Sequence, residues 1–138
     1  MGEHQFFLRK VKAFNLQELL VVLVIIGILL LLAMPTLMPL ISRTKSLEAQ
    51  TQLKHIANMQ KTHFFMHSKY SNDFNAIDFE APMTVEDNGT ANCRYEITEA
   101  SNTSFKARAT AVTDFDGDGV FNIWEIEANG VPKEVVKD

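Results

Sequence analysis

Residues 14–42 read FNLQELLVVLVIIGILLLLAMPTLMPLIS, and this stretch decides how the rest of the chain is built. Glu18 is its only charged residue, and no side chain from Leu19 to Ser42 can ionise. About 20 apolar residues in a helix are enough to cross the hydrocarbon core of a bilayer. A helix in a small soluble domain would show a polar face instead. The stretch is therefore predicted to lie in lipid or to be buried among copies of itself.

A short basic segment precedes this stretch. Residues 1–13 read MGEHQFFLRKVKA, and Arg9, Lys10 and Lys12 stand just before the apolar run. Basic residues on this side hold the N-terminus in the cytoplasm, so the C-terminal part is predicted to cross the membrane. A secretory signal has an apolar region of roughly 7 to 15 residues, followed by a cleavage site of small residues. The run here is longer, so cleavage behind it is not expected.

The segment KVKA-FNLQELLVVLVIIGILLLLAMP resembles the N-terminus of type IV pilins and of type II secretion pseudopilins. The resemblance implies that a prepilin peptidase cuts between Ala13 and Phe14 on the cytoplasmic side and that Phe14 becomes N-methylated. Counted from Phe14, Glu18 is the fifth residue, Gly27 the fourteenth and Pro35 the twenty-second, and all three match the family pattern. Ala13 departs from it, because the family usually has glycine there.

Glu18 is the first candidate assembly residue, together with Phe14. Cleavage would give Phe14 an ammonium group one helical turn from Glu18. In a filament, the Glu18 carboxylate of one subunit would neutralise the Phe14 amine of a neighbour. In a low-dielectric core, such an ion pair mainly fixes the position of one subunit relative to the next, because a misplaced subunit leaves a charge unpaired. The alternative is that Glu18 lies in the headgroup region of the bilayer.

Pro35 is the second candidate assembly residue. A proline inside a helix removes one backbone hydrogen bond and favours a kink, and Pro39 repeats this weakness one turn later. The resemblance to pilins implies that the helix unwinds here on assembly. A static kink is the alternative.

Beyond the apolar run, apolar residues recur at spacings of three and four, so the helix is predicted to continue to about Lys69. A helix of about 55 residues would be some 80 Å long. The predicted fold is α+β, with a long N-terminal transmembrane and amphipathic helix packed on a small antiparallel β-sheet, as in pilins. Its predicted parts are a leader (1–13), a membrane or filament-core helix (14–42), the amphipathic continuation (43–69), and a loop and sheet head (70–138).

The head is predicted to begin with a loop. Residues 70–92 are polar and rich in turn residues, with apolar anchors such as Phe74 and Phe79. Apolar and polar residues then alternate over 93–97 and again over 105–111. This alternation predicts two antiparallel strands, each with one buried face.

Asp114 to Glu125, DFDGDGVFNIWE, matches the D-x-[DN]-x-[DN]-G-x5-E pattern of calcium loops at every defined position. The pattern sets carboxylates at positions one, three and five and a turn glycine at position six. Carboxylates this close repel one another unless a cation lies between them. The candidate ligands are the carboxylates of Asp114, Asp116 and Asp118, the carbonyl of Val120, and the side chains of Asn122 and Glu125.

Calcium is the predicted cofactor, in a structural role. Cys93 is the only cysteine, so no intrachain disulfide can form. The resemblance implies that a disulfide often closes the C-terminal region in this family, and calcium is predicted to tie that region to the sheet instead. A solvated acidic turn is the alternative. Residues 120–126 also alternate like a strand, which would turn Glu125 away from the ion.

Composition excludes some classes of function. Without residues 1–13 the chain carries 10 basic and 16 acidic side chains. This balance argues against a nucleic-acid-binding surface, which would be basic. The sequence shows no nucleophile–base pair, phosphate loop or catalytic metal site, so it predicts a structural protein and not an enzyme.

The sequence thus predicts a structural subunit of a type IV pilus. Its implied partners are copies of itself in a helical filament, the prepilin peptidase and the inner-membrane assembly machinery. The precursor would span the inner membrane once, with its N-terminus in the cytoplasm, before assembly at the cell surface.

Two alternatives remain open. The first is a major pseudopilin of type II secretion, which would stay in the periplasm. The second, from another class, is a monomeric membrane-anchored calcium-binding module, which needs neither Glu18 nor cleavage at Phe14.

Overall fold

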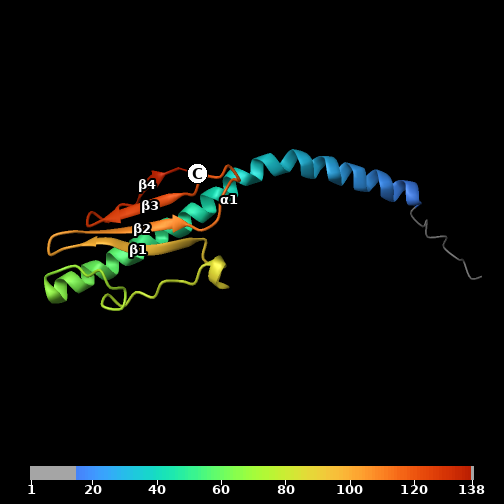
Figure 1. Cartoon of the computed structure of the whole chain (residues 1–138). Coiled ribbons are helices and arrows are strands. Elements are labelled where there is room, and N and C mark those ends of the chain that lie inside the picture. The colour runs from blue at the N-terminus through green and yellow to red at the C-terminus, as the bar shows by residue number, and fades with distance from the viewer. Residues whose placement is uncertain (1–14, 138) are drawn as a thin grey trace, which may run out of the picture. The chain divides into compact units, whose positions relative to one another are not determined.

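The computed structural model describes residues 15–137 and has the predicted α+β fold (Figure 1). The predicted processing residues Ala13 and Phe14 lie outside the described residues. The described elements are the helix α1 (Leu16–His67), the 3-10 helix η1 (Val85–Asp87) and the strands β1 (Cys93–Ala100), β2 (Phe105–Ala111), β3 (Ile123–Glu127) and β4 (Lys133–Val136).

The chain divides into two compact units, and the first ends at Thr36. In its described part, 15–36, every residue is exposed except Gly27, which is half-buried. Within residues 15–137, α1 is the helix that is long and apolar enough to cross a membrane. Apolar side chains surround this part of α1, so it has no polar face to turn toward water. This exposed apolar surface agrees with the prediction that the segment lies in lipid or is buried among copies of itself.

α1 continues through both prolines. Pro35 and Pro39 lack a backbone N–H, so the carbonyls of Leu31 and Pro35 lose their usual helical donors. The boundary between the two compact units, Thr36/Leu37, falls between these prolines. The helix is therefore formed but weakened at the position where the sequence predicts a kink.

The second unit, Leu37–Asp138, contains the rest of α1 and the sheet. This part of α1 runs along one face of the sheet (Figure 1). Its buried residues recur at spacings of three and four, as the sequence predicts, and they are Ala49, Leu53, Ile56, Ala57, Gln60 and His63. The helix ends at His67, close to the predicted Lys69, because Ser68 has a left-handed backbone with φ of 57°.

β2 contributes the central strand of the hydrophobic core beneath α1. Its residues alternate between buried and half-buried, and the buried ones are Phe105, Ala107, Ala109 and Ala111. Alanines on this face leave space for the larger Leu53 and Ile56 of α1, both fully buried. Tyr95 of β1 and Ile126 of β3 complete the same cluster on either side. Small residues on the central strand thus allow the helix to pack directly on the sheet.

The sheet is a meander of four antiparallel strands in the order β1-β2-β3-β4. The two predicted strands are confirmed as β1 and β2. β3 begins at Ile123, later than the alternation from Val120 suggests, and Gly130, with φ of 75°, lies in the turn that leads to β4. The sequence did not predict β4, although an Asn-Gly turn followed by two valines is typical of a hairpin.

The loop 68–92 is fastened to α1 by polar side chains. Gln60 is fully buried, donates from Nε2 to the Ser71 carbonyl (2.6 Å) and accepts from the Ser71 N–H (3.0 Å). Glu48 accepts from the backbone N–H and the side-chain amide of Asn92 at 3.1 and 2.9 Å. The predicted anchors confirm their role, since Phe79 is buried and Phe74 packs against the core.

We expect Leu53→Ala to destabilise the head by about 2–5 kcal/mol, because it leaves a cavity between α1 and β2. Leu47→Ala is the matched control, since Leu47 lies on the same helix but is 52% exposed, and we expect an effect of about 0.5 kcal/mol or less. Urea unfolding of the chain in detergent micelles measures both. Equal effects of the two substitutions would contradict the packing described here.

Candidate functional site

Glu18 lies in the first turn of α1, where the helix leaves backbone N–H groups without helical partners. The first helical bond joins the Leu19 N–H to the Asn15 carbonyl at 3.2 Å. The N-terminal end of a helix carries partial positive charge, which favours a carboxylate there. Glu18 is exposed and makes no ion pair with any residue in 15–137. Its charge is therefore available to a group outside the described chain.

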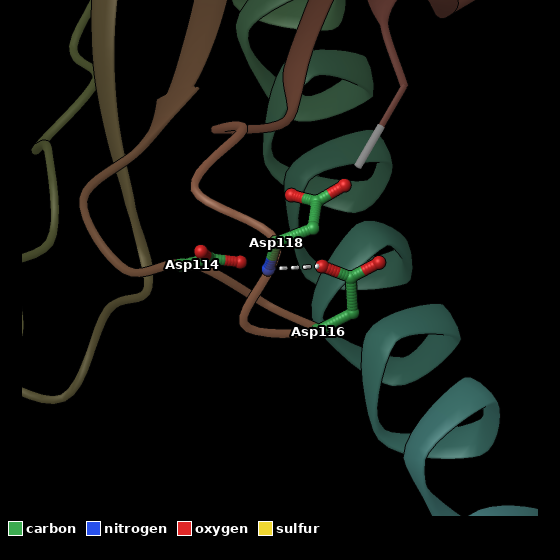
Figure 2. A group of neighbouring side chains, drawn as sticks. All are labelled: Asp114, Asp116 and Asp118. Carbon is green, nitrogen blue, oxygen red and sulfur yellow. Dashed lines mark hydrogen bonds between the residues drawn. The ribbon is translucent and has the colours of Figure 1, made fainter.

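The acidic loop joins β2 to β3 and carries the three predicted aspartates. Carboxylate oxygens of Asp114, Asp116 and Asp118 all lie within 4.8 Å of one another, and Figure 2 shows them on the same loop. Gly117 and Gly119 have φ of 87° and 86°, a left-handed backbone that glycine adopts without strain. These two glycines let the chain turn tightly enough to gather the aspartates.

Backbone N–H groups hold the carboxylates in place. Asp114 accepts from the N–H of Gly117 at 2.7 Å and also from the N–H of Gly119. Asp116 accepts from the Asp118 N–H at 3.0 Å, and Asp118 accepts from the Val120 N–H at 2.7 Å. The loop therefore presents a group of positioned oxygen atoms, the ligand type that calcium prefers.

Backbone hydrogen bonds stabilise the Asp114 carboxyl in its charged form. The hydrogen bond from the Gly119 N–H is the main cause that lowers the pKa of Asp114, and bonds from Gly117, Asp116 and Asp118 add to it. Desolvation opposes this shift. A carboxylate that stays ionised beside two others repels them, and a bound cation would remove that repulsion.

Glu125, the last predicted ligand, lies apart from the three aspartates and has another partner. Glu125 lies in β3, opposite Arg108 of β2, and its Oε1 accepts from Arg108 Nε at 2.9 Å and Nη2 at 2.6 Å. Within residues 15–137, the metal-ligand cluster at the loop contains Asp114, Asp116 and Asp118 without it. The strand geometry directs Glu125 to the sheet surface, where Arg108 neutralises it.

Asn122 has a role that the sequence did not predict. It is 1% exposed, and its Nδ2 donates to Glu134 Oε1 at 2.7 Å and to the Val136 carbonyl at 3.1 Å. Both acceptors belong to β4, so Asn122 ties the C-terminal strand to the sheet. Its Oδ1 is buried and accepts no hydrogen bond from the described residues. The predicted ligation by Asn122 would use this oxygen, while the amide nitrogen is already engaged.

No family model matches the chain. The chain is similar to the type IV major pilin protein PilA of Myxococcus xanthus (strain DK1622), with 40% identity over 68 residues. The predicted resemblance to type IV pilins is confirmed. The match covers 49% of this chain and 31% of that protein, so the chain spans less than a third of the length of this relative.

Cys93 is a free, buried cysteine and forms no disulfide bond. It is 1% exposed, and burial, with a smaller contribution from the nearby Glu48 charge, raises the pKa of its thiol to about 12. A neutral, buried thiol is a poor nucleophile and metal ligand. Asn122, the residue before β3, links β4 to the sheet by hydrogen bonds.

We expect Asn122→Asp to loosen β4, because an acceptor replaces the amide donor and faces the Glu134 carboxylate. A lost buried donor costs about 1–3 kcal/mol, more when a charge is involved. Hydrogen exchange of the β4 amides, Lys133–Val136, measures the effect. Asn58→Asp, on the exposed side of α1, is the matched control and should leave this exchange unchanged. Unaltered protection of β4 in Asn122→Asp would show that the amide does not hold the strand.

Proposed function

We propose that this chain is a structural subunit of a type IV pilus, assembled through the N-terminal half of α1. The observation that carries the proposal is the exposed apolar surface of residues 19–35, which follows a single exposed carboxylate at Glu18. The α+β head and the similarity to a major pilin support it.

The physical reason for assembly lies in this surface. Burial of a leucine or isoleucine side chain contributes about 1.5–3 kcal/mol, so the apolar helix is driven out of water. In a membrane the lipid tails cover it, and in a filament other copies of the same helix do. A subunit therefore passes from one apolar environment to another without exposing this surface to water.

Glu18 makes this transfer selective. We infer that the prepilin peptidase cuts at Ala13/Phe14, and that the new Phe14 amine of one copy pairs with Glu18 of a neighbour. A carboxylate among apolar helices is costly unless it is paired, so a wrongly placed subunit is disfavoured. Before this cleavage the precursor spans the inner membrane with its N-terminus in the cytoplasm. Assembly machinery then moves the cleaved subunit to the cell surface.

The two rival functions use the same features differently. A type II secretion pseudopilin would share α1 and the head but form no long surface filament, and the relative that the chain matches is a major pilin. A monomeric membrane-anchored calcium-binding module would use α1 only as an anchor. Such an anchor has no need of Glu18, so the effect of removing this carboxylate separates it from a filament subunit.

We also propose that the acidic loop binds a structural calcium ion through Asp114, Asp116 and Asp118, with the Val120 carbonyl as a further ligand. The clustered carboxylates and their backbone hydrogen bonds support this proposal. The unpaired, buried Oδ1 of Asn122 follows the loop and offers one more oxygen. An ion there would stabilise the connection from β2 to β3.

We expect Glu18→Ala to reduce surface filaments at least tenfold while the subunit stays in the membrane, because Phe14 then has no carboxylate to pair with. Electron microscopy of sheared surface material, with N-terminal sequencing of the subunit, measures this. Glu80→Ala, which removes an exposed carboxylate of the head, is the control and should assemble normally. Wild-type levels of filament from Glu18→Ala would leave α1 as a simple anchor.

We expect calcium at about 100 times its dissociation constant to stabilise the head by about 2.7 kcal/mol. For a domain of this size, each kcal/mol raises the melting temperature by about 4–8 °C. Calorimetry with calcium and with a chelator should show this shift, and Asp116→Asn should abolish it. Glu125→Gln is the control, because its carboxylate bonds Arg108, and it should keep the shift. A melting temperature that is the same with calcium and with the chelator would refute the proposed calcium site.

A further inference from the structure

The exposed side of α1 in the head carries a line of basic and large apolar side chains with one amide side chain among them. They follow one another at spacings of three, four and seven, which places them along one side of a helix. We name this the basic stripe, and its members are Arg43, Leu47, Lys54, Asn58, Lys61 and Phe65. All are exposed, Leu47 by 52% and Phe65 by 78%. The stripe is thus a continuous surface with both charge and apolar area.

The cations of the basic stripe form no ion pair within the part of the chain that the structure describes. Arg43, Lys54 and Lys61 form no ion pair with any residue of the described range 15–137. Glu48 is the only carboxylate between residues 43 and 67, and it accepts hydrogen bonds from Asn92. The positive charge of the stripe is therefore not balanced on its own helix.

The face of the sheet turned away from α1 carries the opposite charge. We name it the acidic face. Its carboxylates are Glu86, Asp87, Glu96, Glu99, Glu125 and Glu127, and its cations are Arg94, Lys106, Arg108 and Lys133, the last of which lies opposite Glu125. Strand register sets Glu96 and Glu125 on either side of Arg108. Six carboxylates and four cations give this face an excess of two negative charges.

The basic stripe and the acidic face of the same molecule cannot form ion pairs with each other. α1 covers one face of the sheet, and the strand carboxylates Glu96, Glu125 and Glu127 alternate with buried or half-buried residues and point to the other face. Residues 70–137 hold thirteen carboxylates and five cations, while residues 43–67 hold four cations and one carboxylate. The positive and negative surfaces are therefore complementary but separated by the core of the same molecule.

We propose that the basic stripe of one subunit docks on the acidic face of a neighbouring copy in the filament. The proposal rests on the proposed pilus function. Two different surfaces of each copy take part, so the contact is heterologous and repeats along an open helical assembly. Charge pairing selects the partner face and its register, and Leu47 and Phe65 add apolar burial at the contact. An anionic membrane surface could also attract the stripe, but it would leave the acidic face without a role.

Charge reversal in the full chain, expressed in its own cells, tests this contact. Lys54→Glu with Lys61→Glu, and separately Glu96→Lys with Glu99→Lys, should each lower the yield of sheared filaments at least tenfold. The four substitutions together should restore it, because the complementarity returns with its sign exchanged. Lys69→Glu with Lys137→Glu makes the same charge change away from the stripe and should assemble normally. Equal melting temperatures of the heads would show that every variant folds.

The outcomes separate the docking contact from the pilus function. Normal filaments from both double variants would overturn the docking contact alone, as would failure of the quadruple variant with a folded head. Loss of binding to anionic vesicles in Lys54→Glu with Lys61→Glu, with normal assembly, would assign the stripe to a lipid surface and also overturn it. A wild-type chain that forms no filament would overturn the pilus function itself, and Glu18→Ala tests that function independently.

Discussion

The first half of α1 presents apolar side chains on all sides, and the rest of the protein depends on this constraint. From Leu19 to Ser42 nothing can ionise, and within 15–36 only Gly27 is partly covered by the chain itself. Exposing such an apolar surface to water is unfavourable, so we expect lipid or further copies of the helix to cover it. Everything beyond it has to fold as a separate, water-soluble head on the second half of the same helix.

The head is held together by a small hydrophobic core and by several polar side chains that hydrogen-bond to neighbouring segments. Alanines on β2 let Leu53 and Ile56 pack directly on the sheet. Gln60 and Glu48 hold the loop that follows α1, and Asn122 holds β4. Each of these side chains satisfies buried or half-buried polar groups that would otherwise destabilise the fold.

Sequence reasoning succeeded where local pattern and physical role coincide. Alternation over 93–97 and 105–111 predicted β1 and β2, because each strand has one buried and one exposed face. The spacing of Asp114, Asp116 and Asp118 predicted their clustering, because the glycines between and after them allow the turn. The motif does not reveal the partner of its last residue, since β3 places Glu125 opposite Arg108.

The sequence by itself determined the apolar helix, its single carboxylate at Glu18, the first two strands and the three clustered aspartates. Composition, period and short spacing are local properties, and they are readable along the chain. Only the tertiary structure decided the place of β4, the partners of Asn122 and Glu125, and the separation of the basic stripe from the acidic face. Those partners lie 12 and 17 residues away in the sequence, and only strand pairing brings them within hydrogen-bond distance.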